Sequence, residues 1–322
     1  MTLRATFRDE LLAAAPGRVR FAEPMRLHTT FHLGGPAEVW AEPQDEEELR
    51  RLLGLAAEAE IPVTPVGGGA NLLVRDEGIP GLVIHLGSPG FQACRREGDC
   101  LWAGAGLPIE WLVRRAQEEG LTGLEFLAGV PGRVGGAARM NAGTHDDEGV
   151  LHQFADGVRR IQRMDAQGRR QELRKEEAGF SYRASRLDGW IVLQVELSLA
   201  PEDPGKIQER VRRLWDFKKR TQDWSAPSVG CIFKNPAGPL PDGRKIPGAG
   251  WLVDQAGFKG RRLGGAAVSQ RHANFILNSG SASSADVLAL IQEIQTRVRD
   301  RLGISLETEV QTVPVHPSTG SG

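Results

Sequence analysis

Residues 65–74 read PVGGGANLLV, and this stretch decides the fold prediction. A short apolar run precedes three successive glycines, whose backbone N–H groups can turn toward an anion such as a pyrophosphate because no side chain blocks close approach. The spacing is not the GxGxxG of a Rossmann site, and the GK[ST] ending of a P-loop is missing. The stretch therefore predicts an anion-binding turn outside those two classes.

A second glycine-rich stretch at residues 123–145 reads GLEFLAGVPGRVGGAARMNAGTH. The apolar residues between its glycines indicate a tight turn that runs into the start of a helix, which is another place where an anion binds. Either stretch alone is more typical of a structural turn than of a ligand site. Two such stretches in one lobe favour ligand binding.

Composition and charge are those of an ordinary globular protein, with 40% hydrophobic and 25% charged residues among 322, enough for two or three lobes. Forty basic and forty-one acidic side chains give a net charge of −1, which offers no bulk attraction to nucleic acid or an anionic membrane. Cys94, Cys100 and Cys231 lack CxxC spacing, so we expect neither a disulfide framework nor a metal site. No segment approaches the roughly 18 apolar residues of a membrane span, and no signal peptide begins the chain, so a cytoplasmic location is expected.

Helix and strand patterns alternate along the first two thirds of the chain. Asp45 and Glu48 form a possible capping box before an apolar stripe that predicts an amphipathic helix. The stripe consists of Leu49, Leu52, Leu53 and Ala56. Further patterns predict strands at residues 61–66, 81–86 and 190–200, a helix between Pro108 and Gly120, and a hairpin around Gln167 and Gly168.

A break at residues 201–205 is expected to separate two domains. Asp203 and Pro204 can begin a helix there, and a last helix from Ser283 or Ser284 to Leu302 precedes an alternating strand at residues 304–313. The expected domains are residues 1–203, with lobes of about 17–82 and 83–203, then residues 204–311, then a disordered tail at 312–322.

Motifs spread over the whole chain carry a family resemblance. They are TTFHLGGPAEVWAEP at 29–43, PVGGGANLLV at 65–74, GVPGRVGGAARMNAG at 129–143, SYRAS at 181–185, GCIFKNP at 230–236, AGWLVDQAGFKG at 249–260, GGAAVSQRHANFILN at 264–278 and LETEV at 306–310. In this order they resemble the UDP-N-acetylenolpyruvoylglucosamine reductase family over about residues 27–311. The resemblance implies an α+β fold: a two-lobed FAD-binding domain of the vanillyl-alcohol-oxidase/PCMH type and a C-terminal α/β substrate-binding domain.

The resemblance also implies an activity and its cofactor. NADPH would reduce noncovalently bound FAD, and the flavin would reduce UDP-N-acetylglucosamine enolpyruvate to UDP-N-acetylmuramate in peptidoglycan precursor synthesis. The FAD-binding residues carried over are Gly67, Gly68, Gly69, Ala70, Asn71, Leu72, Gly129, Val130, Pro131, Gly132, Gly135, Gly136, Asn141, Ala142 and Gly143.

Three residues match the family's catalytic positions. Arg183 would bind the substrate carboxylate through its planar fork of donors and stabilise developing negative charge. Cys231 stands where most members have serine, the acid that protonates the substrate carbanion. A thiol with an ordinary pKa of about 8.5 is mainly protonated at neutral pH, so it can serve as that acid. Glu309 would be a hydrogen-bonded acid beside the developing charge, with Glu307 structural.

Lys218 or Lys219, Asn235 and His272 match positions that hold the nucleotide diphosphate and sugar. His145 replaces a tyrosine of many members, and the short distance from residue 183 to the strand at 190 leaves no room for the tyrosine-bearing insertion of one subfamily. The chain thus resembles the shorter subfamily. We expect the nucleotide sugar and NADPH as partners, no nucleic acid and no membrane, and a monomer or weak oligomer.

Two other functions stay open on the sequence alone. A different FAD oxidoreductase of the same fold would act on a hydroxy acid or alcohol and would not need Arg183, Cys231 and Glu309 together. A nucleotide-sugar binding protein without catalysis would be consistent with the missing serine, and it would bind flavin yet fail to oxidise NADPH in the presence of substrate.

Overall fold

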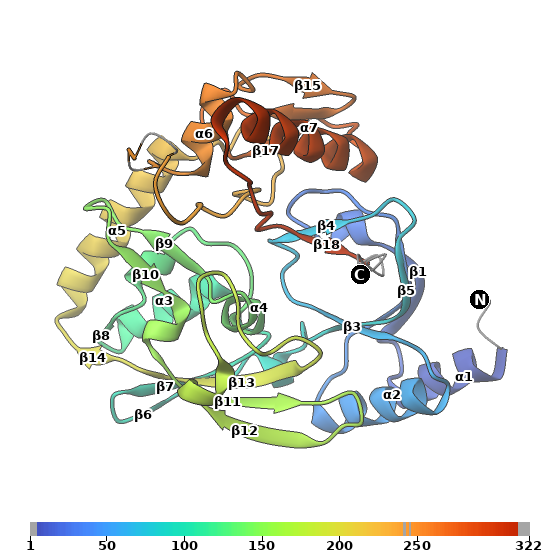
Figure 1. Ribbon diagram of the computed structural model, residues 1–322. Helices are drawn as coiled ribbons and strands as arrows, with labels where there is room; N and C mark the ends of the chain where they lie inside the picture. Colours follow the sequence, from blue (N-terminus) through green and yellow to red (C-terminus); the bar gives the residue numbers. More distant parts are fainter. Residues whose placement is uncertain (1–4, 241–242, 245, 315–322) are drawn as a thin grey trace. The chain divides into compact units, whose positions relative to one another are not determined.

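The computed structural model describes residues 5–240, 243–244 and 246–314 (Figure 1). The chain folds into two units, each with its own apolar core. The first unit comprises residues 5–23, 38–68 and 81–218, and the second comprises residues 24–37, 69–80 and 219–314. The lobes expected at 17–82 and 83–203 share one continuous core in the first unit, which includes Leu49, Leu82, Leu101 and Val195.

The boundary between the units lies after residue 218 and not at the expected residue 203. Helix α5 (Pro204–Thr221) belongs largely to the first unit because its side chains bond there. Arg210 pairs with Glu125 at 2.7 Å, and Val211 packs against the first core. Residues 24–37 and 69–80 also differ from expectation, since Phe31 and other members of these segments lie in the core of the second unit.

Two sheets and five helices organise the described part of the first unit. A four-stranded sheet has the order β1 (Val19–Pro24), β2 (Pro36–Ala41), β5 (Ile79–His85) and β3 (Val63–Val66). A five-stranded antiparallel sheet has the order β12 (Arg170–Arg174), β11 (Val158–Met164), β13 (Ile191–Ser198), β7 (Cys100–Gly104) and β6 (Cys94–Glu97). Two short pairs join β8 (Leu121–Thr122) to β14 (Ala200–Pro201) and β9 (Gly143–His145) to β10 (Leu151–Gln153). The helices are α1 (Ala5–Ala14), α2 (Glu46–Glu58), α3 (Ile109–Glu118), α4 (Val134–Arg139) and α5.

Helix α2 shows why the local patterns predict these elements. The carboxylate of Asp45 accepts from the backbone N–H groups of Glu47 and Glu48, as an N-cap does, and the four predicted apolar side chains are fully buried. Glu48 differs from the expected capping box, because its carboxylate accepts from Gln44 N at 2.7 Å, one residue before the cap. The predicted hairpin at 167–168 is confirmed by the pairing of β11 with β12.

The second unit is built around one helix and a small sheet. Strands β15 (Arg262–Leu263), β16 (Ala266–Val268) and β17 (Ile276–Asn278) form an antiparallel sheet, against which α7 (Ser284–Leu302) packs together with α6 (Ala249–Gln255) (Figure 1). The predicted helix from Ser283 or Ser284 to Leu302 is confirmed as α7, which Ser283 caps in a capping box with Asp286 and Gly303 ends in the left-handed conformation.

The segment after α7 is mostly irregular, so the strand predicted over 304–313 is wrong for most of its length. Thr308 makes a single bridge to Phe233, and regular pairing begins only in β18 (Gln311–Val313), parallel to β4 (Leu72–Val74). Thr308 is exposed although the alternation placed it with the buried residues. Residues 312 and 313 are therefore strand and not tail, while the rest of the expected tail from residue 315 lies outside the described residues.

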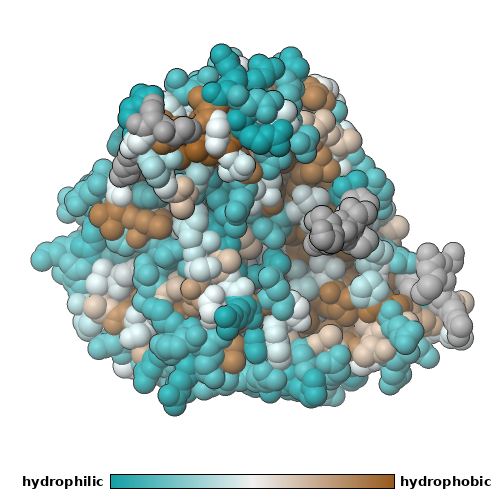
Figure 2. All heavy atoms as spheres, viewed as in Figure 1, coloured by the Kyte–Doolittle hydropathy of each residue, from teal (hydrophilic) through white to brown (hydrophobic). Residues whose placement is uncertain are grey.

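In the described ranges, every helix is too short or too polar to span a bilayer. Figure 2 shows hydrophilic residues over β11 and β12, where charged pairs such as Arg160 with Glu172 and Arg170 with Glu46 lie on the first unit.

Candidate active site

The two glycine-rich stretches meet in the first unit. A Cβ atom placed on Gly68 would lie 2.8 Å from the Cα of Gly132, and one placed on Gly67 would lie 3.7 Å from the backbone nitrogen of Gly136. A side chain at Gly68 would therefore collide with the other loop. The two stretches, which the expected lobes of about 17–82 and 83–203 kept apart, thus touch at Gly67 and Gly68.

Close to this meeting point, the position of the missing side chain of Gly136 is open. A Cβ on Gly136 in α4 would meet no atom within 4 Å, in contrast to Gly135, whose Cβ would lie 3.0 Å from the Cβ of Ala105. Open space lined by glycine backbone fits a phosphate-bearing cofactor such as FAD, because a pyrophosphate needs close approach to backbone N–H groups. Gly67, Gly132 and Gly136 are the residues best suited to hold it.

The remainder of the first loop makes its contacts inside the second unit. Gly69 has φ +62° and lies so close to the carbonyl of His28 that no side chain fits. The side chain of Asn71 donates to the carbonyl of Glu309 at 3.0 Å, and the carbonyl of Asn71 accepts from Gln311 N. Asn71, expected as a cofactor ligand, thus also holds the segment that carries Glu309.

Arg183 lies at the corner of a two-residue turn. Ser181 and Ala184 exchange backbone hydrogen bonds at 3.0 and 3.2 Å, and Arg183 between them has φ +57°. A non-glycine residue in the left-handed region costs about 1–2 kcal/mol, and such strain gathers at functional sites. The guanidinium lies 5.4 Å from the centre of the Tyr182 ring.

A buried asparagine supports this turn from outside. Asn141 is 1% exposed, and its amide nitrogen donates to the carbonyl of Ser181 at 2.9 Å and to Gln153 Oε1 at 3.2 Å. Its Oδ1 accepts from Ala155 N. Because both amide hydrogens bond within the protein, the side chain of Asn141 supports this turn, and a cofactor contact of this residue stays a prediction.

Lys218 is the clearest departure from the expected site. It was expected to hold the nucleotide, but the structure buries it to 2% exposure in the first unit. Its Nζ donates to the carbonyl of Phe126 at 2.7 Å and to that of Ala128 at 2.6 Å, at the start of the second glycine-rich stretch. Burial lowers the pKa of the Lys218 amine to about 7. A neutral amine still has the two N–H donors that these carbonyls need. Lys219, by contrast, is exposed.

The segments of Cys231 and Glu309 are joined in the second unit at Ile232, the residue that follows Cys231. Cys231 follows Gly230, which has φ +77°, and pairs with Phe275 in an isolated bridge. The backbone nitrogen of Glu309 donates to the carbonyl of Ile232 at 2.8 Å. No local pattern predicts this contact, because 77 positions separate residues 232 and 309.

The other residues expected to contact the substrate or the flavin differ in burial and in their partners. Asn235 Oδ1 accepts from Ala249 N at 2.9 Å, so this side chain caps the start of α6. His272 lies 4.6 Å from the Phe275 ring, and burial, with a smaller contribution from Lys259, lowers the pKa of its imidazole. At neutral pH the ring is therefore uncharged. His145 is exposed in β9.

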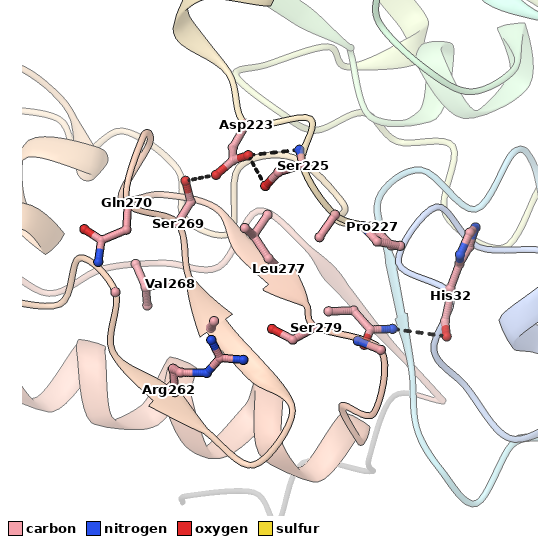
Figure 3. Close-up of a pocket in the computed structure, with 15 residues that line it drawn as sticks. His32, Asp223, Ser225, Pro227, Arg262, Val268, Ser269, Gln270, Leu277 and Ser279 are labelled. Atoms are coloured by element: carbon pink, nitrogen blue, oxygen red, sulfur yellow. Dashed lines mark hydrogen bonds between the residues drawn. The ribbon is translucent and has the colours of Figure 1, made fainter.

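One hollow of about 810 Å³ lies entirely within the second unit, between the three-stranded sheet and the loop at 223–227 (Figure 3). Asp223 bonds there to Ser225 and to Ser269, and Arg262 reaches into it from β15. None of the expected catalytic or substrate-binding residues lines this hollow. Its position thus gives no support to the expected site.

Asn274 is a residue that the sequence analysis missed as a part of the site. It is 3% exposed, and its side chain bonds to both backbone groups of Phe233, two residues after Cys231. The available signal was an amide residue between Ala273 and Phe275 in an otherwise apolar run, since a buried amide must find hydrogen-bond partners.

Comparison with known proteins gives one consistent result. Residues 37–174 match the family described as an FAD binding domain, and residues 222–313 match the C-terminal domain of UDP-N-acetylenolpyruvoylglucosamine reductase. UDP-N-acetylenolpyruvoylglucosamine reductase 2 of Symbiobacterium thermophilum is 40% identical over 311 residues, which cover 96% of this chain and 94% of that protein. The reductase of Heliobacterium modesticaldum is 42% identical, with 90% of this chain and 89% of that protein covered.

A solved structure agrees with these relatives. The crystal structure of UDP-N-acetylenolpyruvylglucosamine reductase from Thermus caldophilus has a TM-score of 0.75 and 37% identity, and the match covers 92% of this chain and 98% of that one. This chain therefore belongs to the UDP-N-acetylenolpyruvoylglucosamine reductase family of FAD-dependent oxidoreductases.

Proposed function

We propose that this chain, as an FAD-dependent reductase of peptidoglycan precursor synthesis, uses Arg183, Cys231 and Glu309 to convert UDP-N-acetylglucosamine enolpyruvate to UDP-N-acetylmuramate. Bound FAD supplies the hydride transfer from NADPH to the substrate. The chain's own residues must then bind the substrate, stabilise negative charge and deliver a proton.

Arg183 binds the substrate carboxylate in this proposal. Its guanidinium offers two parallel N–H donors, and the charge that develops after hydride transfer spreads onto the same carboxylate. The left-handed backbone of Arg183 supports the assignment, because strain of about 1–2 kcal/mol persists only where the surrounding structure requires it.

Cys231 donates the proton to the substrate carbanion, and Glu309 stabilises the developing charge from the neighbouring segment. The observation that carries this part is the 2.8 Å bond between Glu309 N and the carbonyl of Ile232, which keeps the segments of Cys231 and Glu309 together within one unit. This bond supports the proposal because it joins the backbones of two segments whose proposed catalytic residues are 78 positions apart in the sequence. The Cys231 thiol is a stronger acid than the serine hydroxyl that most members carry, so the substitution preserves the chemistry.

The cofactor and the substrate are assigned to separate sets of residues. FAD lies on the glycine backbone of residues 67, 68, 132 and 136, where an added Cβ marks open space at Gly136. Lys219, Asn235 and His272 are the proposed contacts of the nucleotide and sugar, whereas Lys218 supports the cofactor loop through the carbonyls of Phe126 and Ala128. We also propose the shorter subfamily, since β13 begins at Ile191, only eight positions after Arg183.

Stopped-flow absorbance tests the proposal in two steps. NADPH is mixed anaerobically with the purified flavoprotein, and the reduced protein is then mixed with UDP-N-acetylglucosamine enolpyruvate. We expect bleaching of the flavin in the first step and its return in the second. Flavin that reduces but is not reoxidised by this substrate would indicate another oxidoreductase of the same fold, and flavin that NADPH does not reduce would indicate a binding protein without catalysis.

A further inference from the structure

The segment that carries Cys231 is held between two other segments of the second unit. On one side, Cys231 pairs with Phe275, and Ile232 N donates to the carbonyl of Asn274 at 2.8 Å. On the other side, Phe233 pairs with Thr308. Residues 231–233 thus lie in the middle of a short three-segment arrangement.

The side chain of Asn274 adds a second layer of contacts to the same segment. Its Oδ1 accepts from Phe233 N at 2.9 Å, and its Nδ2 donates to the carbonyl of Phe233 at 2.8 Å. With its own carbonyl on Ile232, Asn274 therefore binds two consecutive residues directly after Cys231. Phe233 is 1% exposed, so removal of the Asn274 side chain would leave the buried N–H and C=O groups of Phe233 without these partners.

The need for such support follows from the residue before the thiol. Gly230 has φ +77°, a conformation that glycine adopts freely, and a Cβ placed on it would meet no atom within 4 Å. Glycine permits many backbone conformations, which leaves the direction of the following side chain to be fixed from the other end. The contacts of Asn274 provide that fixed end.

We propose that Asn274 is a positioning residue, which holds the backbone of residues 231–233 so that Cys231 directs its thiol proton at the substrate. This inference rests on the proposed role of Cys231 as the acid. Asn274 itself does not touch the reacting atoms. It acts through two peptide groups, and a shift of about 1 Å in the donor reduces a rate by roughly 100-fold.

Asn274→Ala and Asn274→Asp test the proposal in the full flavoprotein. In the alanine variant we expect flavin reduction by NADPH within about twofold of the parent and reoxidation by the enolpyruvyl substrate slowed about 10- to 100-fold. In the aspartate variant the carboxylate retains the acceptor for Phe233 N but opposes the carbonyl of Phe233, so reoxidation slows at neutral pH. Lowering the pH protonates the introduced carboxyl, which restores a donor, so the rate relative to the parent should recover.

Asn278→Asp is the matched control. Asn278 is a buried asparagine of the same unit, 6% exposed, and its amide donates to the carbonyls of Phe31 and His32 and not to the Cys231 segment. We expect this variant to lose a similar amount of thermal stability while its reoxidation rate stays within about threefold of the parent and shows no recovery at low pH. An equal loss of rate in the control would show that general destabilisation explains the effect and would overturn the proposal.

A double-mutant cycle separates positioning from an independent role. If Asn274 acts through the thiol, Cys231→Ala combined with Asn274→Ala is no slower in reoxidation than Cys231→Ala alone. Losses that multiply, or an Asn274→Ala variant that reoxidises like the parent while Cys231→Ala is slow, would overturn the positioning role only. A Cys231→Ala variant that reoxidises like the parent would instead reject the acid assignment, and the positioning role with it.

Discussion

The turns that carry Arg183 and Cys231 are built in different ways. The turn of Arg183 closes on itself through two backbone bonds between Ser181 and Ala184, and the strain is in Arg183 itself. In the turn of Cys231 the left-handed residue is the preceding Gly230, and the segment is bonded to Phe275, Asn274 and the Glu309 segment, all at least 43 positions away. A self-closed turn is sensitive to its own residues, whereas a turn closed from a distance is sensitive to its partners.

Substitutions should therefore act at different places in the two turns. In the first case the local backbone already stores the conformation, so outside contacts such as Asn141 with Ser181 add support at its edge. In the turn of Cys231, the contacts with distant segments themselves hold the backbone conformation. Four substitutions probe these two kinds of support, which are bonds within a turn and contacts from distant segments.

Gly136→Val should abolish cofactor binding and with it all turnover. Its Cβ would point into open space, so the fold tolerates the side chain, but the branched group would fill the space proposed for FAD. The flavin absorbance of the purified variant and its circular dichroism measure the two parts of the prediction. Gly54→Val is the matched control, because Gly54 in α2 also has no atom within 4 Å of its Cβ and lies outside both glycine-rich stretches. Full flavin content in the Gly136 variant would contradict the cofactor placement.

Cys231→Ala should slow flavin reoxidation by the substrate about 100-fold or more, the range for a lost general acid, while reduction by NADPH stays near normal. Cys231→Ser should lie much closer to the parent, since the hydroxyl keeps a proton to donate. Rapid mixing of the pre-reduced variants with substrate measures the step. Alanine and serine variants with equal rates would mean that residue 231 only packs in the fold.

Arg183→Lys should slow reoxidation about tenfold to 100-fold, because lysine keeps the charge but loses the planar pair of donors for a carboxylate. Reduction by NADPH should change little. Arg186→Lys, an exposed arginine three positions on, controls for general effects of the exchange. Equal damage to both half-reactions would place Arg183 in NADPH binding or in the fold.

Local signals in the sequence predict the elements around the site but not the site's own shape. Asp45 and Ser283 cap their helices through neighbours two or three positions away, so a reader of the sequence can find both helix starts. The alternation over 304–313 misled because it describes side-chain polarity, while a strand also needs a partner. Thr308 pairs with another segment at a single bridge only, and regular pairing with β4 begins at residue 311.

The burial of particular polar side chains could not be predicted from the sequence either. A lysine near the end of an amphipathic helix is usually solvated, and nothing in the local sequence shows that the carbonyls of Phe126 and Ala128 lie above Lys218. Asn141 and Asn274 each lie within a quoted motif, but the segments that they support, at Ser181 and Phe233, lie 40 and 41 positions away. Contacts at this separation decide the site, and a pattern in one sequence does not encode them.

Lys218→Met should remove a pH dependence of the free energy of unfolding that the parent protein has. The result also shows whether support from a distant side chain operates in the first unit, as it does in the turn of Cys231. The pKa of the buried amine is lowered to about 7, whereas an unfolded lysine has a pKa of about 10.4. Between these values the unfolded chain binds one proton more, so this group raises the free energy of unfolding as the pH rises, by up to about 1.4 kcal/mol per pH unit. Below pH 7 the charged amine is buried at full cost, and that cost is relieved toward pH 10.

Urea unfolding at pH 7.5 and pH 9 measures the effect. We expect the free energy of unfolding of the parent to rise by about 1–2 kcal/mol relative to Lys218→Met over this interval, with Lys219→Met, an exposed neighbour, behaving like the parent. Parallel pH profiles for the parent and Lys218→Met would mean that the amine stays charged in the folded protein. A charged Lys218 would suit the nucleotide diphosphate first expected for it, whereas a neutral one, with two N–H donors for two carbonyls, belongs to the support of the cofactor loop.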